Sequence, residues 1–467
     1  MKHFIKKNKK WLFLLLMVVV LGVLTIVSVQ NFFDNGGTIV PFLNNLQSNT
    51  RTLLVLLIWM IPVLLLGLAG IMVFYKDEED APSQQLIVEA DLPSSAGNST
   101  EETPAEVPTE RFCMLSEIDR RSASYGHQHY EKGITLESFC RDFRNYAASQ
   151  LKLYYDIRDI RQFIAGLAVS KLVILQGMSG TGKTSLAHAF GSFTDNSSTV
   201  IPVQPMWKER TDLIGYYNEF TKRFNETLLL EKMYEANYSA DMYITVLDEM
   251  NIARVEYYFA EFLSLLELPD PGERFLEVVS DKWDTDPRQF IDGRILLPKN
   301  MWFIGTANND DSTFAISDKV YDRAMILNLD AKSERFSAPA TSKRPISAQH
   351  FGELVSSAIE EFGISKRNLD RLEKMDQFLI QNFHITFGNR IMKQIKTYIP
   401  VYVACGGDEL TALDDILAKK VIRKLETQNP IYLRKTSEAL LSFIDELFGD
   451  DKMTLCKEYI HRLQRNT

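Results

Sequence analysis

The chain has 467 residues, of which 45% are hydrophobic, and its formal net charge is −9 at pH 7. This length is sufficient for an α/β domain of about 180 residues together with a smaller helical domain. The acidic balance, without a zinc-finger motif, an RRM signature or a strongly basic arm, argues against a stand-alone nucleic-acid-binding protein.

The N-terminal segment, residues 1–76, is predicted to be a membrane anchor. Residues 11–29 and 53–75 are uncharged, mainly apolar stretches, and about 18 such residues in a row indicate a spanning helix. Lysines precede the first stretch, so the positive-inside rule predicts a cell-membrane protein with two spans and with both ends of the chain in the cytoplasm. A cleaved signal peptide is the alternative for the first stretch, but its apolar core is long and no A-x-A-like site follows.

The region after the anchor changes composition twice. Residues 77–110 contain ten acidic residues, four prolines and no lysine or arginine, and this composition predicts a flexible, disordered linker. Residues 111–150 show helical and aromatic patterns instead, so we expect a helical accessory segment there. Aromatic side chains on one face of this segment are expected to pack against the domain that follows.

A phosphate-binding loop is predicted where an apolar strand pattern at residues 171–176 runs into GMSGTGKT and then a helical pattern. Glycines let backbone N–H groups close around phosphate oxygens, and the following helix directs its positive end at them. Lys183 supplies a charge for the outer phosphates, and Thr184 supplies a hydroxyl for Mg²⁺. The residues predicted to bind the nucleotide are Gly177, Ser179, Gly180, Thr181, Gly182, Lys183, Thr184 and Ser185.

Two further apolar runs end in polar side chains that suit hydrolysis. The run beginning at Met242 ends in Asp248 and Glu249. We expect Asp248 to hold Mg²⁺ with Thr184, and Glu249 to orient or deprotonate the attacking water. The alternative is a buried strand that merely ends in solvated acids. The run beginning at Met301 ends in Asn308, which is predicted to position the water or the γ-phosphate from the opposite side.

These strings together resemble an AAA+ ATPase of the McrB, MoxR and dynein-related group. The resemblance covers about residues 150–467 and rests on GMSGTGKTS, LDEMNIARVEYYFAEFLSLLE, GTANNDDSTFAISDKVYDRA and FGNRIMKQI. It implies a P-loop NTPase fold, a three-layer α/β/α core at residues 151–332 with a helical lid at residues 345–467. Residues 212–224 and 275–296 resemble two hairpin insertions of this group, which face the central pore or the substrate.

The resemblance also assigns roles to three polar residues. It makes Asn308 the sensor-1 residue, Arg323 an arginine finger that reaches a neighbouring subunit, and Arg390 the sensor-2 residue of the lid. Pairing of Arg323 with Asp318 or Asp322 is the simpler alternative, because charged helical faces are common.

The function implied is that of a membrane-anchored ring, a hexamer by resemblance, which hydrolyses ATP with Mg²⁺ to remodel or move a protein or nucleic acid. McrB relatives suggest a restriction or defence role and a McrC-like partner. The sequence has no guanine-reading N-K-x-D, so ATP is predicted over GTP. Two alternatives remain, a GTP-specific McrB-like motor and a nucleotide-gated membrane scaffold that recruits an effector.

Overall fold

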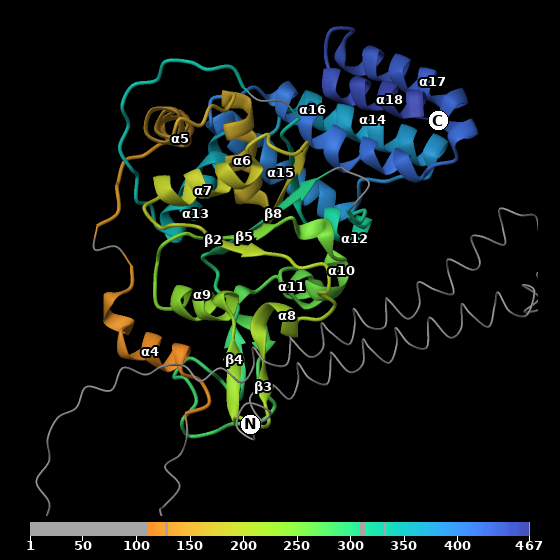
Figure 1. The fold of residues 1–467 in the computed structure, drawn as a ribbon. Coiled ribbons are helices and arrows are strands. Elements are labelled where there is room, and N and C mark those ends of the chain that lie inside the picture. Colours follow the sequence, from red (N-terminus) through yellow and green to blue (C-terminus); the bar gives the residue numbers. More distant parts are fainter. Residues whose placement is uncertain (1–109, 127–128, 309–312, 331–332, 467) are drawn as a thin grey trace, which may run out of the picture. The chain divides into compact units, whose positions relative to one another are not determined.

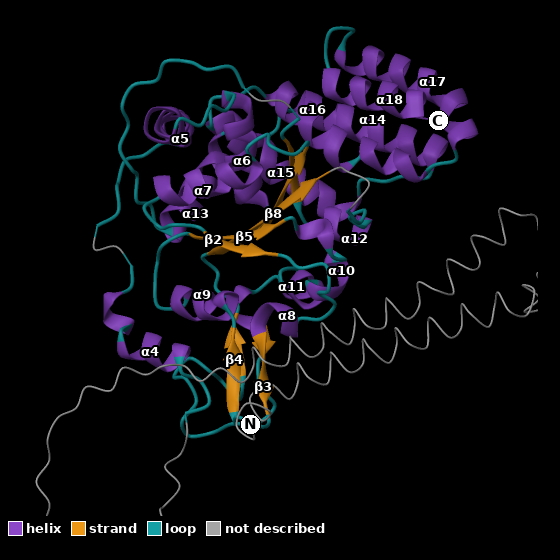
Figure 2. Cartoon of the chain, in the orientation of Figure 1, coloured by secondary structure: helices purple, strands orange, loops and turns teal. Residues whose placement is uncertain are grey.

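A five-stranded parallel β-sheet organises the first part of the structure (Figures 1 and 2). The computed structural model describes residues 110–126, 129–308, 313–330 and 333–466. The strand order is β2-β5-β8-β1-β9, and all neighbouring pairs are parallel, which confirms the α/β class. The strands are β1 (Leu172–Gly177), β2 (Thr199–Pro202), β5 (Tyr243–Asp248), β8 (Met301–Asn308) and β9 (Met325–Asn328).

Helices cover both faces of this sheet (Figure 1). Along β1, Val173 and Leu175 pack in one hydrophobic cluster, whereas Leu172 and Ile174 pack in the other. Successive side chains of a strand point to opposite faces, so a strand covered on both sides must be apolar throughout. One face packs against α5 (Leu136–Leu151), α6 (Ile157–Val169) and α7 (Lys183–Phe193), and the other against α9 (Leu228–Ala236), α10 (Val255–Tyr258) and α11 (Ala260–Leu265).

Two antiparallel hairpins confirm the predicted insertions. The first pairs β3 (Gly215–Asn218) with β4 (Arg223–Glu226), and the second pairs β6 (Phe275–Glu277) with β7 (Arg294–Leu296). Phe220, in the turn of the first hairpin, is 99% exposed. This hairpin therefore presents an aromatic side chain to solvent.

The segment around α4 (Met114–Arg120) connects the two hairpins. The buried guanidinium of Arg111 contacts the carboxylates of Asp286 at 2.7 Å and Asp281 at 2.9 Å, in the connection between β6 and β7. The carboxylate of Glu226, in β4, accepts hydrogen bonds from three backbone N–H groups at the start of α4. The segment is thus bonded to both hairpins, and we refer to it, residues 111–120, as the α4 bracket.

Helices make up the C-terminal part that was predicted as a lid. Helix α15 packs against α6 and α13, which joins these helices to the α/β core. The elements are α13 (Ala348–Glu361), α14 (Lys366–Phe383), α15 (Gly388–Ala404), α16 (Glu409–Lys420), η5 (Ile422–Thr427), α17 (Pro430–Phe448) and α18 (Thr454–Asn466). The remaining short elements are η2 (Ser122–Ser124), α8 (Thr211–Ile214), η3 (Met250–Ile252), η4 (Pro271–Glu273) and α12 (Asp318–Tyr321).

The predicted location in the cell membrane is corrected here. Among the described residues, no helix is long and apolar enough to cross a bilayer. The longest, α17, has 19 residues but carries Arg434, Lys435, Glu438, Asp445 and Glu446, which a bilayer centre does not accept. The two predicted spans, residues 11–29 and 53–75, lie outside the described residues. The absence of a spanning helix among the described residues contradicts the predicted two-span location, and the function proposed below includes no membrane.

Candidate active site

The predicted phosphate-binding loop connects β1 to α7, as its strand–loop–helix pattern requires. Gly177 has φ of +144°, and a Cβ atom built there would lie 2.3 Å from the carbonyl oxygen of Leu329. Gly182, the residue before α7, has φ of +93°. Other residues rarely adopt these conformations. The loop therefore needs glycine at both positions to turn into the helix.

Lys183 extends along the inside of this loop. Its side chain is buried, and its ammonium group donates hydrogen bonds to the carbonyl oxygens of Gly177 at 3.0 Å and Met178 at 2.7 Å. The ammonium group therefore lies at the backbone that would surround the phosphates. The hydroxyl of Thr181 also donates to the carbonyl oxygen of Met178, at 3.0 Å. Ser179 and Gly180 are exposed at the outer edge of the loop.

Asp248 and Thr184 are in direct contact. The Thr184 hydroxyl donates a hydrogen bond of 2.7 Å to Oδ1 of Asp248. Hydroxyl and carboxylate oxygens are the ligands that Mg²⁺ takes in phosphate-transfer sites. The pair thus fits a Mg²⁺ ion bound together with nucleotide phosphates, and Asp248 and Thr184 would hold it.

Thr306 is a site residue that the sequence analysis missed. Its hydroxyl donates to Oδ1 of Asp248 at 2.9 Å and accepts the backbone N–H of Glu249 at 2.8 Å. It therefore holds both acidic residues at the end of β5 from the neighbouring strand β8. The only sequence signal was a hydroxyl residue two positions before Asn308 in an otherwise apolar run.

Glu249 adopts a backbone conformation that is uncommon for its residue type. Its φ is +52° and its ψ +45°, in the left-handed region, and its side chain is exposed. Such strain in a non-glycine residue costs about 1–3 kcal/mol and clusters at functional sites. The conformation ends β5 and starts η3, and it leaves the side chain exposed at the end of this strand.

We expect Thr306→Val to lower turnover about 10-fold while nucleotide affinity changes less than about 3-fold. Valine keeps the shape of the side chain but removes the acceptor for the Glu249 N–H and the donor to Asp248, so the water-activating group loses its alignment. Steady-state phosphate release and equilibrium nucleotide binding measure the two effects. Thr245→Val, the same change in the buried strand β5, is the control. An unchanged turnover in Thr306→Val would remove this residue from the site.

Asn308 lies beside the phosphate-binding loop, as predicted. Strand register pairs it with Gly177, the first residue of the loop. Its carbonyl oxygen accepts a hydrogen bond from Nδ2 of Asn251 at 3.0 Å. Asn251 is buried, and its Oδ1 has no hydrogen-bond partner among the described residues. The two asparagines thus bring amide groups to the strand end where the outer phosphates are expected.

Arg323 and Arg390 lie at the opposite edge of the sheet. Arg323 precedes β9, and both arginines contact the carboxylate of Glu267, Arg323 at 2.7 Å. They border a cavity of about 680 Å³ that also includes Leu172, the first residue of β1. A six-residue strand spans roughly 17–20 Å, and the phosphate-binding loop begins at its other end. The structure therefore does not bring either arginine to the loop of its own chain.

This cavity at the amino edge of the sheet is strongly basic. Its charged lining comprises Lys171, Arg274, Arg323, Arg390 and Lys393, with Glu267 as the single acidic residue. Burial lowers the pKa of Lys171 well below its usual range, and the other four basic residues are three arginines and Lys393. We call this feature the basic cavity.

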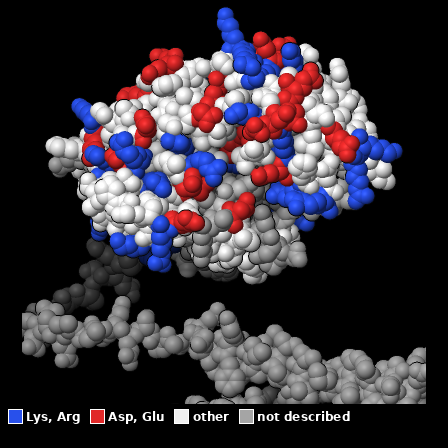
Figure 3. Space-filling view, turned by 90° about the horizontal axis from the view of Figure 1, so that it is seen from above, with Lys and Arg blue, Asp and Glu red and all other residues white. Residues whose placement is uncertain are grey.

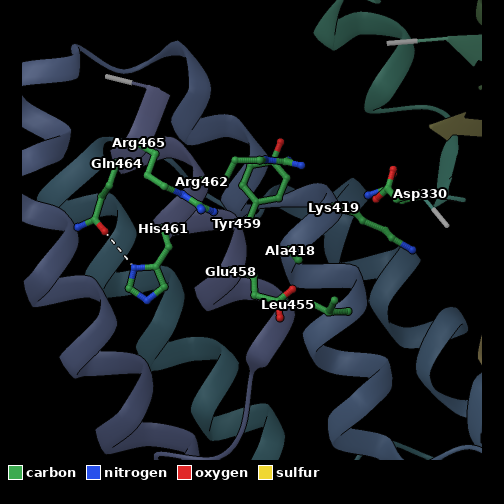
Figure 4. Close-up of a pocket in the computed structure, with 11 residues that line it drawn as sticks. Asp330, Ala418, Lys419, Leu455, Glu458, Tyr459, His461, Arg462, Gln464 and Arg465 are labelled. Carbon is green, nitrogen blue, oxygen red and sulfur yellow. Dashed lines mark hydrogen bonds between the residues drawn. The ribbon is translucent and has the colours of Figure 1, made fainter. Parts of the chain in front are cut away.

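Two cavities adjoin the carboxyl edge instead. One, of about 640 Å³, is bordered by the strand-end residues Gln176 and Asn308. The other, of about 730 Å³, lies between β9 and the C-terminal helices, and Figure 4 shows Arg462 and Arg465 of α18 across it from Lys419 and Asp330. Arg462 borders both cavities. The sequence analysis missed it because a single arginine in an amphipathic helix carries no distinguishing signal.

Comparison with known proteins agrees with this geometry. Residues 172–324 match the family model of the AAA domain (dynein-related subfamily), and residues 345–467 match a domain of unknown function, DUF8727. Over 166 residues the chain is 24% identical to the type IV methyl-directed restriction enzyme EcoKMcrB subunit of Escherichia coli (strain K12). That alignment covers 34% of this chain and 35% of the relative, so the match spans about a third of the curated relative's length.

Similar solved structures include a full-length MCM homolog from Methanopyrus kandleri and NtrX from Brucella abortus. The first is 11% identical, with 67% of this chain and 59% of the other covered and a TM-score of 0.32. The second is 15% identical, with 70% of each chain covered and a TM-score of 0.24. The sequence matches and the site geometry support an AAA+ ATPase of the dynein-related, McrB-like group, a class of P-loop NTPase that binds nucleotide, usually with Mg²⁺.

Proposed function

We propose that the chain hydrolyses ATP with Mg²⁺ in a ring, a hexamer by resemblance, and uses the cycle to remodel or move a macromolecule. One subunit would supply the phosphate-binding loop, Asp248, Glu249 and Asn308. The next subunit would supply Arg323 and Arg390 to the same nucleotide.

The observation that carries this proposal is the position of the basic cavity. Its arginines lie a strand length away from the phosphate-binding loop of the same chain, where they cannot contact the phosphates bound there. Four positively charged side chains around one carboxylate suit a polyanion supplied from outside the chain. A triphosphate held by a neighbouring subunit is such a polyanion. Arg323 and Arg390 would then act on the neighbour, as fingers do in other P-loop enzymes.

The arrangement around Asp248 favours hydrolysis over a scaffold that only binds nucleotide. A binding-only site needs the phosphate-binding loop and the metal ligands. Here Glu249 is additionally held in a strained conformation, with its backbone fixed by Thr306. Strained conformations of this kind cluster at active sites, which favours a carboxylate that acts on a reactant. ATP is proposed over GTP because the chain lacks the guanine-reading N-K-x-D pattern.

The hairpins are the proposed contact to the macromolecular substrate. The exposed aromatic ring of Phe220 would give the end of the first hairpin an apolar surface for contact with the substrate. On the face shown in Figure 3, basic and acidic side chains are interspersed, so that face is not a uniformly basic nucleic-acid surface.

The similarity to the EcoKMcrB subunit leads us to propose a restriction setting with a McrC-like partner.

A ring that completes its sites between subunits should lose activity on dilution. We expect phosphate release per subunit to rise with protein concentration and to level off once the ring has formed. Mass photometry at the same concentrations, with a non-hydrolysable ATP analogue, should show oligomers appearing over the same range. Constant turnover per subunit in a monomeric sample would refute the shared site and leave the phosphate-binding loop assignment intact.

A further inference from the structure

The residues just before β9 form a short segment that carries Arg323. Helix α12 (Asp318–Tyr321) leads into Asp322, Arg323 and Ala324, where β9 begins at the next residue. The Arg323 guanidinium donates to the carbonyl oxygen of Lys319 at 2.7 Å, within the same segment. The same guanidinium contacts Glu267, which follows α11, at 2.7 Å, so it is held both by its own segment and by this carboxylate. We call residues 318–324 the finger segment.

Tyr321 connects the finger segment to the nucleotide site of its own chain. Its hydroxyl donates a hydrogen bond of 3.0 Å to Oε1 of Gln176, the residue directly before Gly177 of the phosphate-binding loop. Tyr321 also borders the cavity next to Asn308. Burial raises the pKa of Tyr321, so its hydroxyl stays a donor. A change at the loop or in this cavity therefore reaches the finger segment through one side chain.

Lys420, the last residue of α16, connects the finger segment to the helical lid. The residue is 3% exposed, and its ammonium group donates to the carbonyl oxygens of Tyr321, at 2.6 Å, and Ala324. These two carbonyls flank Arg323 on both sides along the chain. Asp322, Arg423, Lys424 and Arg390 are the charged groups around it, and burial lowers the pKa of Lys420 to about 7.

Three further lid side chains hold the same segment. Arg423 contacts the carboxylate of Asp318 at 2.6 Å, and its guanidinium lies 3.9 Å from the centroid of the Tyr321 ring. Lys424 lies 3.5 Å from the carboxylate of Asp322, and Gln394 donates to the Asp322 carbonyl oxygen at 3.1 Å. A shift of the lid relative to the sheet would therefore carry the finger segment with it.

We propose that Tyr321 and Lys420 are positioning residues for Arg323, which transmit the state of a subunit's own nucleotide site and lid to the finger that it offers its neighbour. This inference rests on the proposed function, because it requires that Arg323 act on another subunit. It adds the direction of the signal, from the site of one subunit to the hydrolysis step of the next.

The test uses mixed rings of the full-length chain in which donor and acceptor are distinct. The donor carries Glu249→Gln, so that its own site still binds ATP without hydrolysing it, and keeps its finger, and the acceptor carries Arg323→Ala and keeps its phosphate-binding loop. Activity that appears on mixing comes from donor fingers in acceptor sites. Tyr321→Phe or Lys420→Met is then added to the donor, and Lys420→Met alone to the acceptor, because Tyr321 borders the acceptor's own nucleotide cavity. Lys435→Met, an exposed lysine of α17, is the matched control.

We expect either change in the donor to lower the turnover regained on mixing about 5-fold, the effect of one lost hydrogen bond. Lys420→Met in the acceptor should leave turnover and nucleotide affinity within about 2-fold, because the finger used there belongs to the other chain. Thermal unfolding of each variant verifies that it is folded. Equal losses in donor and acceptor, or none in the donor, would overturn the relay. If mixing donor and acceptor without a further change at Tyr321 or Lys420 gave no activity, Arg323 would not act on a neighbouring subunit. The relay would then be refuted together with the finger role.

Discussion

Glu249→Gln is expected to bind ATP and Mg²⁺ about as well as the unmodified chain and to hydrolyse ATP at least about 10²-fold more slowly. The amide has the size of the carboxylate but cannot accept a proton from water. The hydrogen bond from Glu249 to Thr306 uses the backbone N–H, so the change leaves this end of β5 in place. Equilibrium binding of a fluorescent nucleotide and steady-state phosphate release measure the two effects separately.

Lys183→Ala should instead lower nucleotide affinity, the property that Glu249→Gln leaves unchanged. It removes the ammonium group that lies against the carbonyl oxygens of the loop, so affinity for the triphosphate should fall. Glu438→Gln, the same acid-to-amide change at an exposed position of α17, should alter neither binding nor turnover. If Glu249→Gln turned over at the unmodified rate, the water-activating role would belong to another residue. Equal ATP affinity in Lys183→Ala would place the phosphates elsewhere.

Arg323→Ala should also bind ATP normally, but its turnover should fall about 10³-fold or more, the range found for arginine fingers in other P-loop enzymes. The side chain lies at the amino edge of the sheet, away from its own phosphate-binding loop, so its loss should affect only the neighbour's site. Mixing Arg323→Ala with Lys183→Ala subunits should therefore restore part of the activity. Phosphate release at several mixing ratios tests this.

Arg434→Ala is the control, because it removes an arginine from the exposed surface of α17. It should retain full turnover, and mixing should add nothing. A finger that acts within its own chain would give a different result, because Arg323→Ala and Lys183→Ala would then each be inactive alone and remain inactive when mixed.

The parts of the site that the sequence predicted are contiguous in the chain. The phosphate-binding loop is one uninterrupted string, and Asp248, Glu249 and Asn308 each end an apolar run, so strand geometry brings them to one edge. Thr306 could not be predicted in the same way, because its role depends on the register between β5 and β8. The contacts of Tyr321 with Gln176 and of Lys420 with Ala324 join residues 145 and 96 positions apart.

The position of Arg390 depends on how the lid packs rather than on any local pattern. FGNR marks the start of α15 in the sequence, but only the packing of α15 against α6 determines which edge of the sheet that helix end reaches. The arginine there shares Glu267 with Arg323. Its sensor-2 role remains a prediction, and the structure places it with the residues proposed to face the neighbour.

The α4 bracket has a consequence for where the ATPase can be cut. Asp119, at 7% exposure, accepts the hydroxyls of Tyr234 and Tyr238 at 2.6 and 2.5 Å, and Phe112 is fully buried. A protein that began at residue 151, where the predicted core begins, would leave the buried Tyr234 hydroxyl and the half-buried Tyr238 hydroxyl without this acceptor. Removing one partner of a buried polar contact costs about 1–3 kcal/mol.

The loss would extend to charged groups, because Asp286, whose side chain is 6% exposed in the intact structure, would lose Arg111. Breaking a buried ion pair on one side is among the most destabilising changes known. The smallest unit able to fold on its own therefore begins near residue 110, well ahead of the first strand. The segment that the sequence analysis predicted to be accessory is therefore part of the folded ATPase domain. Limited proteolysis should give a stable fragment that begins near residue 110 rather than near residue 151.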